Sequence, residues 1–497
     1  MIQNLQIIST RDQNRSMRTE ATPQREGQLA WRQALWMLKA HLQGELLPPD
    51  DDDYAAARTV WNAAIDRHPA MIIRCLNAAD VQAAVTFARE YHLAVSVRSG
   101  GHSPAGFGTT DGGMVIDLSR MKAISIDPIQ RTARLQPGLT WAEVAQAAHP
   151  YGLALTSGDT GSVGVGGLLL GGGMGWMVRK YGLTIDRLRA VELVTADGHF
   201  LRASAQENAD LFWGLRGGGG NFGVATAFEV DLHPAGTVLG GTLLYDATHA
   251  GDTERMVRAY AHLAAAAPDE LTTIGMLLCA PQVPFIPQAY HGKPVFMISV
   301  CYTGDLALGE RVVAPLRTLG TPIADLVARM PYPAMFALTE EAAKRGRAHD
   351  GRALLLRTLD DEALRTLVRE ALVFMAPGVF VQLRVLGGAM SRVAREATAF
   401  AHRDAQAMVV VGYGAPKTAQ TACLQASMGQ IWQAIRPYSA GAYVNFLMEE
   451  REQRVHEAYP PATYARLVAL KRRYDPTNLF HLNQNIAPAR TGWLSLK

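Results

Sequence analysis

Two glycine-rich segments in the first half of this 497-residue chain restrict its fold more than any other feature. The first, Val97–Ser103, reads Val-Arg-Ser-Gly-Gly-His-Ser and ends a short apolar run typical of a strand. The second, Ser162–Gly175, follows about sixty residues later. Glycines permit positive φ angles and let backbone N–H groups converge on an anion. Two such loops in one domain predict a long diphosphate ligand threaded between them; two ordinary tight turns are the alternative.

His102 lies at the tip of the first glycine segment. Its position directly after Gly100 and Gly101 brings the imidazole close to the backbone that is expected to bind the ligand. A histidine beside an anion-binding loop can act as a nucleophile as well as a hydrogen-bond donor. The residues alone leave two interpretations open, a group that attaches to the ligand and an ordinary surface histidine.

Length, charge and cysteine content narrow the class of protein. A chain of 497 residues exceeds one ordinary hydrophobic core, so two domains are expected. A net charge of +3 without a dense Lys/Arg stripe gives no reason to expect nucleic acid as a partner. The N-terminal region lacks the apolar stretch of a secretory signal, and no apolar run is long enough for a membrane span. The four cysteines form no CxxC pair, so neither a metal site nor a disulfide framework is predicted, and a cytoplasmic location is expected.

The periodicity of apolar residues predicts two regions of different topology. An amphipathic helix over residues 24–43 is predicted to precede them. Helix and strand patterns then alternate, which indicates β-α-β units; the helices are Tyr54–Asp66 and Ala78–Tyr91, and the strands are Met71–Cys75 and Ala94–Arg98. From about Gly236 onward, a second pattern predicts an antiparallel sheet that carries helices. Its strands are Thr242–Tyr245, Gly275–Cys279 and Val295–Tyr302, and its helices include Thr253–Ala267 and Asp361–Phe374.

Several segments taken together resemble one protein family, the berberine bridge enzyme-like FAD-linked oxidases of the vanillyl-alcohol-oxidase superfamily. These segments are Val97–Gly108, Asp117–Lys122, Gly164–Gly175, Arg179–Leu183 and the tail Tyr474–Pro488. The resemblance implies an α+β fold, in which a two-subdomain PCMH-type FAD-binding domain is joined to an antiparallel-sheet substrate domain with helices. We place an N-terminal helical extension at 1–48, the FAD-binding domain at 49–236, the substrate-binding domain at 237–440 and a C-terminal segment that returns to the FAD domain at 441–497.

The resemblance also implies which residues bind FAD. In the family, the histidine at the position of His102 carries FAD covalently through the 8α-methyl group of the flavin. Glycines in the two loops would let the diphosphate approach the backbone, where a side chain would hold it away. Asn483 and Asn485 are expected at the isoalloxazine edge or the ribityl chain, whereas Gln484 is left open. The full predicted set is His102, Ser99, Gly100, Gly101, Ser103, Gly164, Gly167, Gly171, Gly172, Gly175, Gly223, Val224, Asn483 and Asn485.

One departure from the family pattern concerns the number of covalent links. Many members attach FAD a second time, through a cysteine before the second glycine loop. Thr160 occupies that position, and a hydroxyl does not supply the thiolate that attacks the flavin. We therefore expect a single link through His102 and a redox potential below that of doubly linked relatives. Val163 matches a position associated with oxygen access in the family, and a small valine there favours an oxidase.

A dinucleotide fingerprint in the chain has the wrong context for NAD. Gly218–Gly223 satisfies the G-x-G-x-x-G pattern, but a Rossmann loop must open a helix. The following residues, Val224–Asp231, have the alternation of a strand. The resemblance instead places this segment beside the adenine half of FAD.

Tyr443 is the predicted catalytic base. Oxidation of an alcohol or phenol requires a proton acceptor near flavin N5. The segment Ala442–Phe446 resembles the strand of the family whose first tyrosine lies there, and Asn445 is expected to orient it. A tyrosine can serve only if a nearby cation lowers its pKa well below about 10. A buried core tyrosine is the alternative.

The predicted function is that of an FAD-dependent oxidase. It would take a hydride from a small alcohol, amine or phenolic metabolite and pass the electrons to O2, releasing H2O2. A carbohydrate oxidase is the first alternative; it would need an open groove with stacking aromatic residues, for which Tyr290, Tyr302, Tyr332 and Phe336 are candidates. A flavin-binding protein without turnover is the second.

Overall fold

The computed structural model describes residues 23–341, 343–448 and 452–488. Helix α1 (Pro23–His41) agrees with the predicted N-terminal helix and belongs to a compact unit that ends at His41. Residues 42–497 form a second compact unit, to which the remaining description applies. Strand β1 (Glu45–Leu47) is part of this second unit, although it falls inside the range assigned above to the extension. Among the described residues, no helix is both long and apolar enough to cross a membrane.

A four-stranded sheet has the order β1-β2-β4-β3. β2 (Met71–Arg74), β4 (Met114–Asp117) and β3 (Val95–Arg98) are parallel, and α3 (Ala78–Glu90) connects β2 to β3, which confirms the predicted β-α-β unit. These three strands are largely apolar and almost entirely buried, the pattern expected of parallel strands covered on both faces. The first glycine segment therefore starts at the carboxyl end of a buried parallel strand.

The helix predicted over Tyr54–Asp66 is wrong beyond its first turn, because α2 (Tyr54–Ala57) ends at Ala57. The chain then crosses to the strand that begins at Arg347. Asn62 pairs with Arg347 in a parallel bridge, and the Ala63 N–H donates to the Arg347 carbonyl at 2.9 Å. A continued helix would have used these backbone groups internally. A contact distant in sequence thus overrides the local helical pattern.

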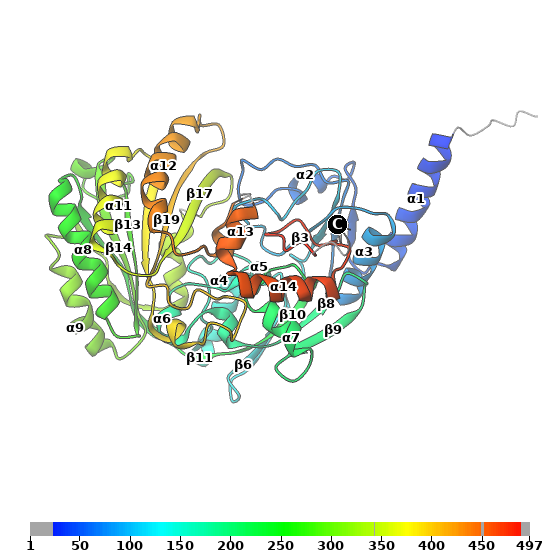
Figure 1. Ribbon diagram of the computed structural model, residues 1–497, viewed down its shortest axis with the longest axis horizontal. Coiled ribbons are helices and arrows are strands. Elements are labelled where there is room, and N and C mark those ends of the chain that lie inside the picture. The colour runs from blue at the N-terminus through cyan, green and yellow to red at the C-terminus, as the bar shows by residue number, and fades with distance from the viewer. Residues whose placement is uncertain (1–22, 342, 449–451, 489–497) are drawn as a thin grey trace, which may run out of the picture. The chain divides into compact units, whose positions relative to one another are not determined.

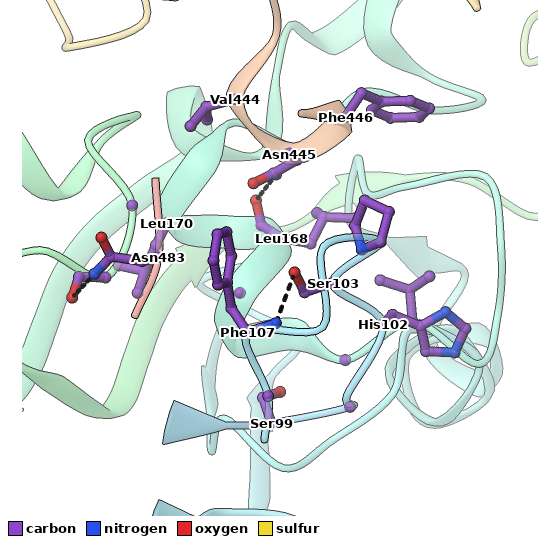
Figure 2. Close-up of a pocket in the computed structure, with 18 of the residues that line it drawn as sticks. Ser99, His102, Ser103, Phe107, Leu168, Leu170, Val444, Asn445, Phe446 and Asn483 are labelled. Atoms are coloured by element: carbon purple, nitrogen blue, oxygen red, sulfur yellow. Dashed lines mark hydrogen bonds between the residues drawn. The ribbon is translucent and has the colours of Figure 1, made fainter. Parts of the chain in front are cut away.

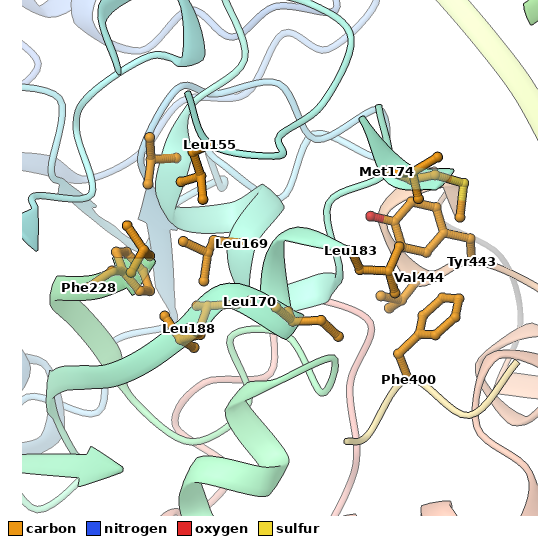
Figure 3. Packing of buried hydrophobic residues seen from close by; sticks show 14 of the residues in the cluster. Leu155, Leu169, Leu170, Met174, Leu183, Leu188, Phe228, Phe400, Tyr443 and Val444 are labelled. Carbon is orange, nitrogen blue, oxygen red and sulfur yellow. The ribbon is translucent and has the colours of Figure 1, made fainter. Parts of the chain in front are cut away.

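A five-stranded antiparallel sheet has the order β5-β6-β10-β8-β9, and a short β7–β11 pair lies outside it. The bounds are β5 (Ile124–Asp127), β6 (Thr132–Leu135), β10 (Val224–Asp231), β8 (Leu188–Val194), β9 (Phe200–Ser204), β7 (Leu153–Ala154) and β11 (His233–Pro234). The helices of this region are α4 (Trp141–Ala148), α5 (Val165–Gly171), α6 (Val178–Tyr181) and α7 (Ala209–Leu215). Its apolar core includes Leu169 and Phe228 and extends to Phe400 and Tyr443 (Figure 3).

The largest sheet is antiparallel and carries helices on one face, as predicted (Figure 1). Its path is β15-β12-β14-β13-β18-β19-β17, and β16 also pairs with β12. The strands are β12 (Thr237–Asp246), β13 (Leu271–Cys279), β14 (Pro294–Tyr302), β15 (Ala324–Asp325), β16 (Ala328–Pro331), β17 (Arg347–Leu356), β18 (Val379–Val385) and β19 (Ala407–Pro416). The helices are α8 (Ala250–Ala266), α9 (Leu306–Arg317), α10 (Ala337–Glu340), α11 (Asp361–Phe374) and α12 (Ala422–Ile435). The core between this sheet and its helices is separate from the core of the five-stranded sheet.

The C-terminal part, with α13 (Glu452–Ala458) and α14 (Pro461–Tyr474), ends in a tail that packs beside the loop before β10. The fully buried Lys471 forms an ion pair with Asp475 at 2.7 Å. The Lys471 ammonium also donates to the carbonyls of Asn221 at 2.8 Å and Phe480 at 2.9 Å. A buried ammonium with three partners fixes the tail against this loop, because breaking the set would leave a charge unpaired.

Candidate active site

One cavity of about 450 Å³ gathers residues from all three large sheets and from the C-terminal tail. Its volume falls in the range typical of cofactor and substrate sites, about 300–1,000 Å³. Figure 2 shows Ser99, His102 and Ser103 on the first glycine loop, Leu168 and Leu170 on α5, and Asn445, Phe446 and Asn483 from the C-terminal part. The predicted site residues that line the cavity are Ser99, Gly100, Gly101, His102, Ser103, Gly164, Gly167, Gly223, Val224, Tyr443, Asn445 and Asn483.

The two glycine loops contact each other directly. A Cβ atom added to Gly100 would lie 2.4 Å from the Gly164 nitrogen, and one added to Gly164 would lie 2.5 Å from the Ser99 hydroxyl oxygen. That hydroxyl also accepts a hydrogen bond from the N–H of Gly166 at 3.2 Å. Backbone atoms fill the space between the loops at this point, and the expectation that a diphosphate is bound by both loops stays a prediction. The joined loops form one wall along which a ligand can lie.

The glycines of the second loop have two different surroundings. Gly167 lines the cavity, and a Cβ atom there would have no protein atom within 4 Å. Gly171, Gly172 and Gly175 do not line the cavity. A Cβ atom at Gly171 would meet the Asn445 amide and one at Gly172 would meet the Tyr443 ring, at 2.0 and 2.8 Å. The prediction that these glycines face the ligand is corrected: they leave room for the side chains of residues 443 and 445, and Gly175 packs on residues 157 and 158.

His102 has the properties of a buried neutral imidazole. Its Nε2 atom is buried and has no hydrogen-bond partner among the described residues. Burial, assisted by the charge of Arg345 and by His349, lowers the pKa of His102 to about 3. The ring is therefore unprotonated at neutral pH, and a lone pair is available for a bond to a ligand.

The C-terminal tail contributes amides to the same cavity. The Asn483 amide nitrogen donates to the carbonyls of Gly220 at 3.2 Å and Phe480 at 3.0 Å, whereas its buried Oδ1 has no partner among the described residues. Gln484 lines the cavity but its amide donates to the carbonyls of residues 447 and 448. Asn485 also has a buried Oδ1 without a described partner, yet it does not line the cavity.

These features fit FAD. Buried polar groups normally have partners, so the unpaired Nε2 of His102 and Oδ1 of Asn483 indicate a ligand with groups that complete these bonds. The joined glycine loops offer backbone rather than side chains on the same wall. Val224–Asp231 is a strand, which confirms that Gly218–Gly223 does not open a Rossmann helix.

Tyr443 is held by two hydrogen bonds but is not activated as a base. Its hydroxyl oxygen accepts the Gly173 N–H at 2.7 Å and the Asn445 amide at 2.9 Å. Burial nevertheless raises the pKa of Tyr443 to about 12, although these bonds and the charge of Arg384 act in the opposite direction. This direction is opposite to the lowered pKa that a tyrosine base requires. The hydroxyl stays protonated, and its own hydrogen is available to a group in the cavity.

A buried ion pair that lines the cavity joins the loop before α5 to strand β18. Arg384 and Asp159 are 2.7 Å apart, with 7% and 13% of their side chains exposed. The Arg384 guanidinium also donates to Gln382 Oε1 at 3.1 and 2.8 Å and lies 5.3 Å from the centre of the Phe446 ring. Sequence reasoning missed this group. The signal was the alternation Val381-Gln-Leu-Arg-Val385, which places two polar residues on one face of an otherwise apolar strand.

The loop between residues 158 and 164 contains no thiol. The Thr160 hydroxyl donates to the Thr339 hydroxyl at 3.1 Å and lines the cavity, as does Val163. All four cysteines belong to the described part of the chain, and none of them lines the cavity. Within that same part of the chain, no group of three or more His, Cys, Asp or Glu residues could hold a metal ion.

Two sequence families match the chain, one near each end. Residues 69–204 match the family described as FAD binding domain, and residues 442–487 match the family described as berberine and berberine like. The first match contains both glycine loops and His102, and the second contains Tyr443, Asn445 and Asn483.

Individual relatives are similar over nearly the whole chain. (R)-6-hydroxynicotine oxidase of Paenarthrobacter nicotinovorans is 33% identical over 462 residues, which are 90% of this chain and 97% of the relative. Carbohydrate oxidase of Microdochium nivale is 29% identical and covers 89% of this chain and 92% of its own. The crystal structure of 6-hydroxy-D-nicotine oxidase from Arthrobacter nicotinovorans superposes with a TM-score of 0.80 at 30% identity, covering 90% of this chain and 98% of that one.

Proposed function

Because this chain belongs to the berberine bridge enzyme-like FAD-linked oxidases, we propose that it oxidises a small alcohol, amine or phenolic metabolite and uses O2 as the electron acceptor. The observation that carries the proposal is the single cavity in which His102, Tyr443 and the Arg384–Asp159 pair meet. When bound, FAD supplies the hydride acceptor and transfers the electrons to O2, which yields H2O2.

We assign His102 as the single covalent attachment point of FAD. Its neutral ring with an unpaired Nε2 supports a bond to the cofactor, and the absence of a cysteine among the lining residues supports one link rather than two. Residues of the first glycine loop, with Gly164 and Gly167, would hold the diphosphate through backbone N–H groups. Asn483 would complete its amide bonds on the flavin.

We assign Tyr443 as a hydrogen-bond donor to the reacting group of the substrate rather than as the base. The hydroxyl oxygen accepts the Gly173 N–H and the Asn445 amide, so its own hydrogen is free to bond to a ligand in the cavity that Tyr443 lines. Asn445 also donates to the Leu168 carbonyl at 3.0 Å, so its orientation is tied to α5 (Figure 2). Two carboxylates line the cavity, Asp159 and Asp350, and we assign the role of proton acceptor to Asp159, because Arg384 holds it at the cavity wall.

The substrate side favours a small molecule over an oligosaccharide. Besides the ion pair, it presents the aromatic rings of Phe380 and Phe446 and the small residue Val410. The residues considered as a sugar-stacking platform do not contribute: Tyr302, Tyr332 and Phe336 are buried, and neither they nor Tyr290 line the cavity. The similarity to carbohydrate oxidase keeps sugar oxidation as the second candidate.

An anaerobic titration tests the proposal. The flavin absorbance of the purified protein would be followed while small amines, phenols and alcohols are added, with mono- and oligosaccharides as a parallel series. We expect bleaching by a member of the first series. Bleaching by sugars alone would replace the proposed substrate class with carbohydrates, and a spectrum that no compound changes would favour flavin binding without turnover.

A further inference from the structure

Three aromatic rings form a stack at the proposed attachment point. The rings of Trp61 and His102 are 5.3 Å apart between centroids and 20° from parallel, and those of Trp61 and His349 are 4.1 Å apart and 15° from parallel. Trp61 therefore stacks on both imidazoles. All three residues line the cavity, although they come from the segment after α2, the first glycine loop and strand β17.

Trp61 is fixed at both its backbone and its side chain. Its backbone N–H donates to the carbonyl of Gly101, the residue before the histidine, at 3.0 Å. Its indole N–H donates to the carbonyl of Ala343 at 2.7 Å. A tryptophan whose backbone and indole N–H groups are both satisfied, and whose ring stacks on two imidazoles, has little freedom to rotate, so it can act as a rigid surface for the His102 ring.

The backbone of His349, whose ring stacks on Trp61, is also fixed. The Asn62 side chain accepts the His349 N–H at 3.0 Å and donates to its carbonyl at 2.9 Å. His349 is 8% exposed, and its buried Nε2 has no partner among the described residues. Arg345, on the same segment, donates to the carbonyl of Gly100 at 2.6 Å. The start of β17 is thus attached to the segment after α2 through Asn62, and Arg345 just before it is attached to the first glycine loop.

The function of such a stack follows from what a covalent attachment requires. An imidazole in a glycine loop rotates about two side-chain bonds, and a bond to a bound ligand forms only in one orientation. Stacking against a fixed indole favours that orientation without protonating the ring or occupying its unpaired Nε2. Arg345 and Arg347 place positive charges near the stack, which disfavours protonation of either imidazole.

We propose that Trp61, supported by His349, is the positioning residue that orients His102 for covalent attachment of FAD, so that attachment depends on the docking of strand β17 against the FAD-binding region. This proposal rests on the single link through His102 put forward above. In the attachment, a bond forms between an imidazole nitrogen and the 8α carbon. One hydrogen leaves the methyl group and one leaves the imidazole. These two hydrogens and two electrons reduce the flavin ring, and O2 then reoxidises the ring to give H2O2.

The test compares total and covalent flavin in wild type, Trp61→Ala, Trp61→Phe and His349→Ala. Total flavin per chain is read from absorbance of the native protein, and covalent flavin is the part that stays with acid-precipitated protein. We expect wild type to retain nearly all of its flavin after acid. Trp61→Ala should bind flavin but retain at least about 5-fold less of it covalently, and Trp61→Phe should restore retention because a flat ring is back in place. His349→Ala should fall between them.

The outcomes separate the positioning role from the link itself. Wild type that releases its flavin in acid would overturn the covalent link and the positioning role with it. Full covalent retention in Trp61→Ala, with wild type also retaining its flavin, would overturn only the positioning role. The positioning role would also be overturned if Trp61→Ala and Trp61→Phe each lost total and covalent flavin to the same extent. Trp61 would then serve folding or general flavin binding. As a kinetic readout, excess FAD added to Trp61→Ala should attach at a rate at least about 5-fold below that of flavin-free wild type.

Discussion

The two walls of the cavity use different parts of the chain to face a ligand. The FAD-side wall presents mostly backbone, from the joined loops around Gly100 and Gly164 and from Gly167. The opposite wall presents side chains from strands and loops, with Gln382 and Arg384 on β18 and Asp159 before α5. A backbone wall recognises a ligand through N–H groups and shape and is disturbed mainly by added atoms, whereas a side-chain wall can change specificity by single substitutions. The cofactor and the substrate therefore depend on different kinds of residue.

The largest effect is expected at His102, the side chain of the FAD-side wall that would bond to the cofactor. His102→Ala should release all of its flavin in acid, a loss of covalent retention of at least about 100-fold. His233→Ala is the matched control, because His233 is also buried, has an unpaired Nε2 and has its pKa lowered to about 3 by burial, but lies outside the cavity. Covalent flavin in His102→Ala would show that another residue carries the link.

The ion pair of the side-chain wall can be compared with a buried pair elsewhere. Asp159→Asn should lower the free energy of unfolding by about 3–5 kcal/mol, measured by urea denaturation, and kcat/KM at least about 10-fold. Asp186→Asn breaks the equally buried Arg403–Asp186 pair, whose partners are 2.8 Å apart, and should lower stability by a similar amount. Folded Asp186→Asn should keep its turnover per bound flavin. Equal losses of turnover in both variants would mean that Asp159 acts only through folding.

Tyr443 lies where the two walls meet. Tyr443→Phe leaves the Gly173 N–H without its acceptor and should lower kcat about 10–100-fold, while flavin stays bound. Because burial raises the pKa of Tyr443 to about 12, its hydroxyl stays protonated between pH 6 and 10. The wild-type rate should therefore show no tyrosine ionisation in that range, as measured by a pH–rate profile. A step in kcat near pH 9 that disappears in Tyr443→Phe would restore the tyrosine as the base.

Alanine substitutions at two glycines of the second loop are expected to have different effects, one on flavin binding and the other on protein stability. Gly167→Ala should lower the flavin content several-fold but raise the stability of the flavin-free protein by up to about 1 kcal/mol, because Gly167 lies within α5 and a methyl group meets no protein atom. Gly172→Ala should lower stability by about 1–3 kcal/mol, since its φ is +150° and its Cβ would meet Tyr443. Flavin content and urea denaturation measure both. The same response in the two variants would contradict the assignment of their surroundings.

The smallest effect concerns the pH dependence of stability at the Trp61 stack. Burial and the charge of Arg347 lower the pKa of His349 to about 4, below the value of about 6.5 in the unfolded chain. The unfolded state then binds more protons than the folded state. The contribution of neutral His349 to the free energy of unfolding is therefore complete above pH 6.5 and is lost as the pH falls toward 4. His349→Phe keeps a ring against Trp61 and should reduce the stability difference between pH 7 and pH 5 by about 1–2 kcal/mol. An unchanged difference would place the pH sensitivity elsewhere.

The failed predictions share one physical cause, which is contact between segments distant in sequence. The pattern after Ala57 is helical, but pairing of residue 62 with Arg347 holds the chain extended. Gly171 and Gly172 have the sequence context of a ligand-binding loop, but they pack on Asn445 and Tyr443, some 270 residues away. Local patterns predict local backbone and say little about which distant side chain occupies the neighbouring space.

The sequence by itself predicted the β-α-β unit, the glycine loop that carries His102 and the strand after Gly223, because each is encoded within a few consecutive residues, and the resemblance of these segments to the family implied FAD. Only the tertiary structure decided that Trp61 and His349 stack beside that histidine, that Arg384 pairs with Asp159, and that burial raises the pKa of Tyr443. Stacking, ion pairing and desolvation depend on distances between groups and on the exclusion of water, and these are fixed only when the sheets pack together.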